Sequence, residues 1–248
     1  MNPLLAFQLR RVARNRQFLF FTVLLPALFT VFFTKIFGGQ ASNAADYQDV
    51  AASLMVSMMA YGAIGAALGA TIRISFDRAS GWLRQLRVTP VPQTHIVAVD
   101  VAVGALLTLP SLLVVALVGR FVNGVQLGPS TWFGLVGALW IGSVAFVALG
   151  LLLGLSLDEK AAGGAIGLVS VVLATLGGLW VPVEVFPESM QVLARFLPSY
   201  WYAELGRDVA AGSPPAAVAV LALAGFTAAF AALAVLVARR RPMYAVAG

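Results

Sequence analysis

Asp100 is the ionisable residue whose position could most directly support chemistry, because it lies about two turns into an otherwise apolar stretch, 94–118. An isolated acid at the centre of a bilayer costs about 2.5–3.5 kcal/mol, and less near the surface, so we expect this side chain to face protein or water. Such a carboxylate could bind a substrate or carry a proton. The alternative is an acid close enough to the interface to reach headgroup water or to pair with Arg73.

The other reactive side chains do not form a catalytic set. The sequence has no cysteine and a single histidine, His95, which argues against cysteine metal sites and histidine clusters. It has no recognisable nucleophile beside a base and no Gly-x-x-x-x-Gly-Lys-Ser/Thr phosphate loop. We therefore expect a protein that is not an enzyme, that binds no metal or cofactor of its own and that cannot hydrolyse ATP.

The composition indicates which elements must position these residues. Of the 248 residues, 60% are hydrophobic and 10% are charged, against roughly 25% charged in a soluble domain. Uncharged stretches of about 20 residues recur, and each is long enough to cross the hydrocarbon core as a helix. We predict an all-α integral membrane protein, a single domain over 1–248, whose six spans are 18–37, 51–72, 94–118, 132–155, 161–181 and 216–238. Gly65-x-x-x-Gly69 predicts close packing of the second span against protein.

The basic residues indicate an orientation. Of the 16 Lys and Arg, 12 lie in four places: a basic amphipathic segment at 1–17 that we expect on the membrane surface, the loop 73–87, Lys160, and the cluster 239–241. Positive charge marks the cytoplasmic side. The sequence therefore predicts a multi-pass protein of the bacterial cytoplasmic membrane with both termini inside. The placement of the basic residues also argues against nucleic acid as a partner, because the ends of the spans account for the charge.

The segment 76–90 has the pattern of a short amphipathic helix that ends before a proline. Trp82, Leu83 and Leu86 fall near one helical face, while Arg84 and Arg87 lie on others. One interpretation is a loop that rests on lipid headgroups. The other is a docking helix for a cytoplasmic partner.

The segment 182–198 is too interrupted by proline and charge to span the membrane, yet it keeps many apolar residues. It predicts a pair of short, broken helices at the interface or re-entering it. Within it we mark Pro182, Glu184, Phe186 and Pro187 as a candidate extracellular gate. Glu184 could equally be an ordinary acid of the outer face.

Aromatic and methionine side chains in the first two spans suggest a path for apolar cargo. Phe29 and Phe33 in the first span, with Met55 and Met59 in the second, offer adaptable apolar surfaces, to which Asp100 adds one polar group. The same residues could simply face lipid or pack against other helices.

Two motifs resemble a known family. The run Asp77-Arg78-x-x-Gly81-x-Leu83-x-Gln85-Leu86-x-Val88-Thr89-Pro90 is similar to a cytoplasmic segment of ABC-2 type transporter permeases, including exporters of the daunorubicin-resistance type. A second set is similar to the family pattern before the last span: Gly178, Pro182, Phe186-Pro187, Leu197-Pro198, Tyr202 and Arg207. Their order covers essentially the whole chain. Ala79, Trp82 and Arg84 depart from the usual residues, so charge pairing with a partner cannot be transferred.

The resemblance implies a permease subunit of an ATP-driven exporter. In that arrangement two permeases, identical or paralogous, face each other above two separate ATPase subunits that bind ATP and Mg²⁺. The residues that would couple them to the ATPase are Asp77, Arg78, Gly81, Trp82, Leu83, Gln85, Leu86, Thr89 and Pro90. The expected cargo is a hydrophobic or amphipathic small molecule such as a drug, antibiotic or lipid. The alternative function is an ion-coupled carrier or channel that needs no ATPase, with Asp100 as its coupling site.

Overall fold

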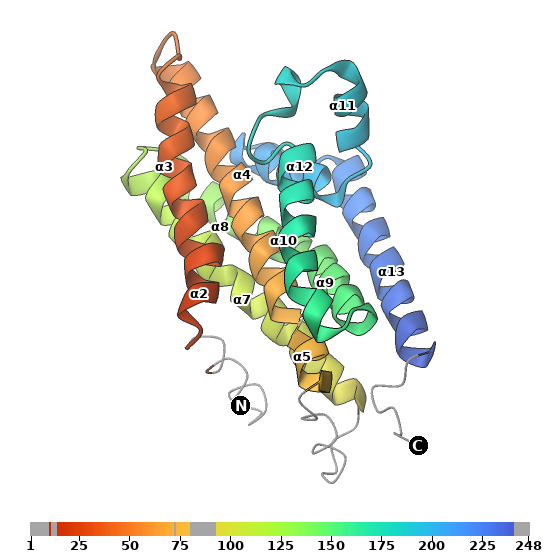
Figure 1. Ribbon diagram of the computed structural model, residues 1–248. Coiled ribbons are helices and arrows are strands. Elements are labelled where there is room, and N and C mark those ends of the chain that lie inside the picture. The colour runs from red at the N-terminus through yellow and green to blue at the C-terminus, as the bar shows by residue number, and fades with distance from the viewer. Residues whose placement is uncertain (1–9, 11–13, 72, 80–92, 241–248) are drawn as a thin grey trace, which may run out of the picture.

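The computed structural model describes residues 10, 14–71, 73–79 and 93–240, and this part of the chain consists of helices and their connections without a β-strand. Six helical stretches within it are long and apolar enough to cross a membrane, as the sequence predicts (Figure 1). Their bounds are Arg16–Gly38, Ala44–Phe76, Ala98–Phe121, Pro129–Ser156, Glu159–Leu176 and Ala217–Arg240. The fold class predicted from composition is therefore confirmed.

Helix α4 (Ala44–Thr71) is the centre of the bundle. In the most apolar stretch of its span 72% of the residues are buried, whereas the value for α13 (Ala217–Arg240) is 11%. Helix α4 packs along α7 (Gln93–Phe121) and also contacts α3 (Leu25–Gly38), α9 (Val144–Ser156) and α12 (Pro198–Ala210). A helix that is apolar on every side is stable only in protein or lipid, and here α4 lies in protein while α13 leaves most of its surface to lipid.

The first span is not a regular helix. It begins with α2 (Arg16–Leu19), passes through the π-helical turn η1 (Phe20–Leu24) and continues as α3. Pro26 explains the π-helical turn, because proline has no N–H to donate to a carbonyl of the preceding turn. The amide of Leu25 bonds instead to the carbonyl of Phe20, five residues back. Such a wide turn often marks a functional position.

The structure departs most from the predicted spans in three places: the start of α4, the middle of the fourth span, and the end of the fifth span, which lies at Leu176 rather than near Val181. Helix α4 begins at Ala44 rather than near Ala51, because the Asn43 carboxamide oxygen accepts the amides of Ala45 (2.9 Å) and Asp46 (3.0 Å) and so caps it. The fourth span is interrupted at Ser143, which separates α8 (Pro129–Gly142) from α9. The Ser143 hydroxyl donates to the carbonyl of Trp140 (2.6 Å) at this break.

The chain between the fifth and sixth spans forms a cap. Helix α10 (Glu159–Leu176) ends at Gly177-Gly178, where Gly178 has a φ of +75° that favours glycine. A 3₁₀ turn, η2 (Val183–Val185), and α11 (Glu188–Ala194) follow. Then α12, which the hydropathy pattern did not reveal, packs against α4, α8 and α13. Its Tyr202 is fully buried and donates to the Leu139 carbonyl of α8 (2.6 Å).

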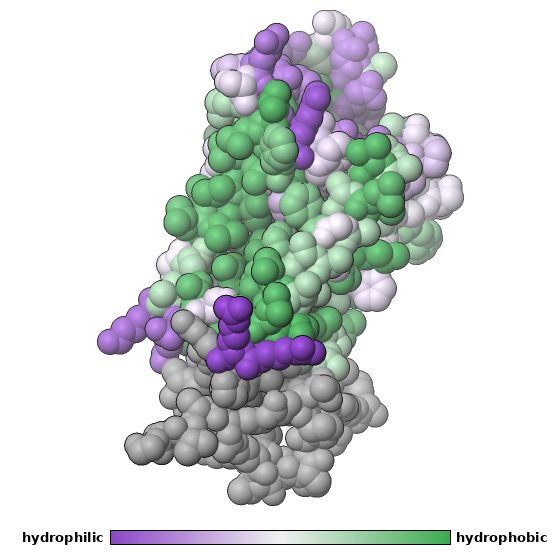
Figure 2. All heavy atoms as spheres, turned by 90° about the vertical axis from the view of Figure 1, so that its right-hand side faces the viewer, coloured by the Kyte–Doolittle hydropathy of each residue, from purple (hydrophilic) through white to green (hydrophobic). Residues whose placement is uncertain are grey.

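The two ends of the bundle differ in charge. The starts of α2 and α10, the helix α5 (Arg73–Ala79) and the finish of α13 share one end, which we call the basic end (Figure 1). The loop 39–43, the loop 122–128 and α11 lie at the opposite end. Figure 2 shows a broad apolar band, with hydrophilic residues gathered at its upper end and a few more along its lower edge. Positive charge near the ends of spans is the pattern that orients membrane proteins, so the structure agrees with the predicted placement of both described chain ends on one side.

The opposite end is fastened by hydrogen bonds between distant segments. The Asn123 carboxamide donates to the Thr30 carbonyl (3.1 Å) and the Thr34 hydroxyl (2.9 Å). The Tyr47 hydroxyl donates to the Asn123 carbonyl (3.1 Å), and Gln48 both donates to the Gly124 carbonyl and accepts the Gln126 amide, each at 3.0 Å. We call Thr34, Tyr47, Gln48 and Asn123 the polar clamp. It ties the loop after α7 to α3 and α4.

Candidate functional site

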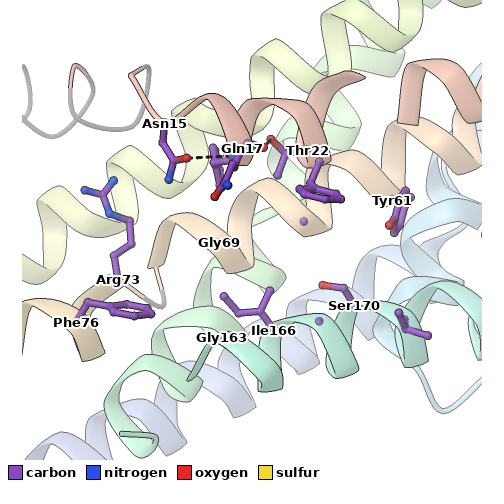
Figure 3. Close-up of a pocket in the computed structure, with 15 residues that line it drawn as sticks. Asn15, Gln17, Thr22, Tyr61, Gly69, Arg73, Phe76, Gly163, Ile166 and Ser170 are labelled. Carbon is purple, nitrogen blue, oxygen red and sulfur yellow. Dashed lines mark hydrogen bonds between the residues drawn. The ribbon is translucent and has the colours of Figure 1, made fainter. Parts of the chain in front are cut away.

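A cleft of about 750 Å³ lies between the first span and α10, with α4 as its floor (Figure 3). It extends from α5 at the basic end to Tyr61 and Ser170 in the middle of the bundle. Its lining residues come from four elements: Asn15, Gln17, Phe18, Phe21 and Thr22; Tyr61, Gly65 and Gly69; Arg73 and Phe76; and Gly163, Ile166, Gly167, Ser170 and Val171. A cavity of this size is in the range of small-molecule sites.

Glycine shapes both the floor and one wall of the cleft. A Cβ atom added at Gly69 would come within 2.6 Å of the Phe18 ring, so the floor is closed where the first span crosses α4. A Cβ at Gly163 or Gly167 would meet nothing within 4 Å. The first span and α4 thus need glycine at position 69 in order to pack closely. On α10, by contrast, the glycines leave open space that belongs to the cleft.

The walls are mostly apolar, and two polar side chains of the first span bond locally. The Asn15 oxygen accepts the Phe18 amide (3.1 Å), and the Thr22 hydroxyl donates to the Phe18 carbonyl (2.7 Å). The Ser170 hydroxyl oxygen is shielded from solvent and has no hydrogen-bond partner among the described residues. A buried hydroxyl of this kind is able to bind a ligand that reaches it.

Aromatic rings continue from the inner limit of the cleft toward the opposite end. The Tyr61 ring lies edge-on to Trp180, with centroids 5.5 Å apart, and Trp180 lies edge-on to Phe29 at 6.4 Å. Phe29 in turn contacts Phe33, at 5.5 Å. We call Tyr61, Trp180, Phe29 and Phe33 the aromatic row. It joins α3 and α4 to the segment that follows α10.

The residues predicted to form a path do not themselves line the cleft. Met55 and Met59 are fully buried in the core, and Phe29 and Phe33 are half-buried against that core. Phe29 and Phe33 are linked to the cleft through the aromatic row. Asp100 is half-buried in α7 and is not among the cleft-lining residues. A role of these residues in transport stays a prediction.

The predicted gate residues lie in the cap at the opposite end. Pro182 immediately precedes η2, in which Glu184 is exposed, and Phe186 and Pro187 connect η2 to α11. Phe186 is half-buried, and its carbonyl accepts the side-chain amide of Gln191 (2.9 Å). A gating function for this turn stays a prediction.

Comparison with known proteins identifies the chain. The pattern of the family described as ABC-2 type transporter matches residues 3–211, which covers five of the six spans and all of α12 beyond them. The chain belongs to the ABC-2 type transporter family. It is also 29% identical over 237 residues to the Bacillus subtilis (strain 168) protein named "Putative transport permease YvfS", covering 94% of this chain and 95% of that protein. The resemblance found in the motifs is thus confirmed.

Membership in the ABC-2 type transporter family assigns this chain to the membrane-embedded subunits of ABC transporters, which associate with an ABC ATPase and are generally not catalytic themselves. The predicted ATPase-coupling segment begins in α5, which includes Asp77 and Arg78. Their side chains and the residues from Gly81 to Pro90 lie outside the described part of the structure. The coupling helix therefore stays a prediction.

The cleft of this ABC-2 permease was not predicted from its sequence. One part had a visible signal, since Gly65-x-x-x-Gly69 indicated a closely packed face of α4, and Gly163-x-x-x-Gly167 repeats that spacing on α10. Nothing in the chain order shows that α10 faces Phe18 and Phe21 across a cleft whose floor is α4. That relation depends on tertiary packing.

Proposed function

We propose that this chain is the permease of an ATP-driven exporter that moves a hydrophobic or amphipathic small molecule out of the cytoplasm or the inner leaflet. The observation that carries the proposal is the cleft, which is apolar, glycine-walled and reaches from the basic end to the middle of the bundle. A molecule with an apolar body would be stabilised there by burial of its surface. Membership in the ABC-2 type transporter family implies that the chain associates with an ABC ATPase.

The aromatic row supports an outward route beyond the cleft. Tyr61 belongs to both features, so cargo in the cleft would meet the edge-on contact between Tyr61 and Trp180 first. Movement of α10 relative to α4 would separate these rings, because Trp180 follows the end of α10. Glu184 and Phe186 in the cap would then be the last groups before release.

The ATPase would act on the permease at the basic end. Helix α5 contributes Arg73 and Phe76 to the cleft and leads directly into the predicted coupling segment 76–90. An ATPase that pulled on this segment would act on the cleft wall through one short helix. We further propose that two permeases, two copies or a copy and a paralogue, face each other in the cytoplasmic membrane, with the basic end inside.

The rival function, an ion-coupled carrier or channel, predicts a different energy source for transport, an ion gradient instead of ATP. The permease would be purified with the ATPase that associates with it and reconstituted in vesicles, and efflux of a neutral amphipathic dye such as Nile red would be followed. We expect efflux that requires ATP, survives a proton ionophore and disappears with an ATPase variant unable to hydrolyse ATP. Efflux that needs a proton gradient and ignores ATP would overturn the proposal.

A further inference from the structure

The inner limit of the cleft holds a hydroxyl that the protein itself leaves without a hydrogen bond. The Ser170 oxygen is shielded from solvent, lines the cleft and has no partner within the part of the chain that the structure describes. Figure 3 shows it on the side of α10 that faces α4. Other hydroxyls of the spans differ, since those of Thr22, Thr30 and Thr71 each donate to the carbonyl four residues back, at 2.7–2.8 Å. The Ser170 donor is therefore available to a ligand.

Two other shielded serine hydroxyls show why Ser170 is distinct. Ser111 and Ser199 also have no hydrogen-bond partner in the described residues, but each is packed against a glycine. A Cβ atom added at Gly62, for example, would overlap the Ser111 oxygen. Beside Ser170 the glycine has the opposite effect, because a Cβ at Gly167, three residues earlier on α10, would meet nothing within 4 Å. Of these three hydroxyls, the one at Ser170 thus lies beside open space.

Two neighbouring groups are hydrogen-bond donors as well. Tyr61 presents a second hydroxyl at the same end of the cleft, from α4. Trp180, whose ring lies edge-on to Tyr61 at 5.5 Å, has an indole N–H that is likewise shielded and lacks a partner among the residues described. An indole N–H can only donate, so a ligand group that satisfies it must be an acceptor. The inner end of the cleft and the first contact beyond it therefore suit an acceptor.

The surroundings of Ser170 make such an acceptor count. Ile166 and Val171, next to it on α10, line the cleft with apolar side chains. In an apolar site a hydrogen bond is stronger than in water, and an unpaired donor is correspondingly costly. A hydrocarbon in the cleft would leave the Ser170 O–H unpaired, whereas a carbonyl oxygen in the same place would accept it. A site that pairs one group of its ligand discriminates against an analogue without that group.

We infer that Ser170, with Tyr61 beside it, forms a hydrogen-bonding subsite for cargo that carries an acceptor oxygen, such as a ketone, ester or amide carbonyl, on an apolar body. The inference rests on the proposed function and narrows its cargo class. The carbonyl could belong to a drug-like molecule or to the ester of a membrane lipid. Both present the same acceptor to the subsite.

The test pairs a change in the cargo with a change in the protein. Two neutral photoreactive probes have alkyl chains of equal length with a diazirine, and one carries a ketone where the other carries a methylene group. The full-length chain in nanodiscs of ether-linked phosphatidylcholine, which has no carbonyl, is irradiated with each probe. Mass spectrometry measures labelling of the peptide that contains Phe18 and Phe21, which line the cleft. Comparing the ketone-to-methylene ratio between variants cancels the unequal partition of the probes into lipid.

Removing the hydroxyl should remove the preference for the ketone. In Ser170→Ala we expect the labelling ratio to fall about fivefold, the usual effect of one hydrogen bond. The melting temperature should not fall, because the lost hydroxyl has no partner in the described structure. An unchanged ratio, including an equal loss of labelling by both probes, would overturn the inference. Failure of the ketone probe to label this peptide in the wild-type protein would overturn it as well.

Two further variants locate the subsite. Ser111→Ala is the matched control, because it removes another shielded, unpartnered hydroxyl that does not line the cleft, and it should keep the wild-type ratio. A fall as large as that in Ser170→Ala would contradict the assigned position. Tyr61→Phe keeps the aromatic ring that contacts Trp180 and should also lower the ratio. A wild-type ratio in Tyr61→Phe would remove Tyr61 from the subsite.

The source of the carbonyl and the two proposals are separated in the same assay. If ester-linked phosphatidylcholine abolishes labelling by the ketone probe, lipid esters occupy the subsite, whereas labelling that persists indicates a smaller carbonyl compound. The labelling ratio needs no ATPase, so its failure to change in Ser170→Ala leaves ATP-driven export of other cargo standing. Conversely, efflux without ATP would refute the exporter while the ratio could still be measured.

Discussion

At the opposite end of the bundle, side chains of one segment bond to the backbone of another, whereas at the cleft two spans face each other across open space. The polar clamp joins α3, α4 and the loop after α7, and Tyr202 joins α12 to α8. On the cleft side, Gly163 and Gly167 of α10 have no neighbour within 4 Å of an added Cβ. The first region joins its helices by hydrogen bonds, and in the second α10 borders the open space of the cleft.

This difference fits a transporter that is driven from one end. Motion requires regions of low local packing, and rigid elements are needed to transmit it. Helix α4 serves as the fixed element, because it is the most enclosed span and contributes to both the polar clamp and the cleft floor. If the two regions differ in this way, substitutions at the cleft should reduce transport, and substitutions at the polar clamp should reduce stability.

The largest effect on transport is expected in the predicted coupling segment 76–90, which would connect the ATPase to the cleft. Leu86→Asp places a charge on the apolar face of the predicted coupling helix, and we expect complete loss of ATP-driven transport with normal membrane insertion. Ser80→Asp adds the same charge on the polar side of that helix and should retain transport. Normal transport by Leu86→Asp at equal expression would remove the coupling role of the segment.

Filling the open side should stop transport without unfolding the protein. Gly167→Leu projects into the cleft, where there is space for it, and leucine is a better helix former than glycine. We expect efflux to fall about tenfold, equivalent to about 1.4 kcal/mol, with an unchanged melting temperature in detergent. Gly225→Leu, in an equally open position on α13, is the matched control and should transport normally. A lowered melting temperature in Gly167→Leu would show that the cleft is not open.

Breaking the polar clamp should have the reverse result, a loss of stability. Asn123→Asp removes the donor to the Thr30 carbonyl and the Thr34 hydroxyl and sets a buried carboxylate against an acceptor. The expected cost is about 1–3 kcal/mol, the usual penalty for an unsatisfied buried group. Thermal unfolding of the purified protein measures it, with the exposed Gln126→Glu as the control. An equal shift in both variants would mean that the clamp does not hold the helices.

The smallest effect is expected at Tyr202. Tyr202→Phe removes the hydrogen bond to the Leu139 carbonyl and should cost about 1 kcal/mol of unfolding free energy. Burial raises the pKa of the Tyr202 phenol, so the folded protein keeps a proton that the unfolded chain loses above about pH 10. The contribution is therefore complete below pH 10 and declines as the pH rises above it. Tyr202→Phe should show a shallower alkaline loss of stability than Tyr200→Phe, and identical slopes would contradict this account.

The sequence predicted the spans well and the site poorly. Long apolar stretches need only the thickness of the bilayer to become helices, so the six spans follow from composition. The break at Ser143 and the early start of α4 each involve the hydrogen bonds of one side chain, Ser143 and Asn43. Helix α12 was missed because its face of charged and polar residues lowers its hydropathy, although Tyr202, Ala203 and Gly206 are buried.

The cleft could not be predicted because it arises from residues far apart in the chain. Phe18, Tyr61 and Ile166 belong to three spans whose relative placement no local pattern specifies. The methionines chosen as path candidates show the same limit, since an adaptable apolar side chain has the same appearance in a core as in a cavity. The structure places Met55 and Met59 in the core.

The central claim is that segment 76–90 lies on the cytoplasmic side and contacts the ATPase. Labelling of a single introduced cysteine tests it most directly, because the natural chain contains no cysteine. Leu83→Cys would be exposed to a membrane-impermeant maleimide in right-side-out and inverted vesicles, and then to a short bifunctional crosslinker in the presence of the ATPase. The account predicts labelling only in inverted vesicles and an ATP-sensitive crosslink to the ATPase. Labelling from the outer medium, or a segment that crosslinks to no other subunit during turnover, would contradict it.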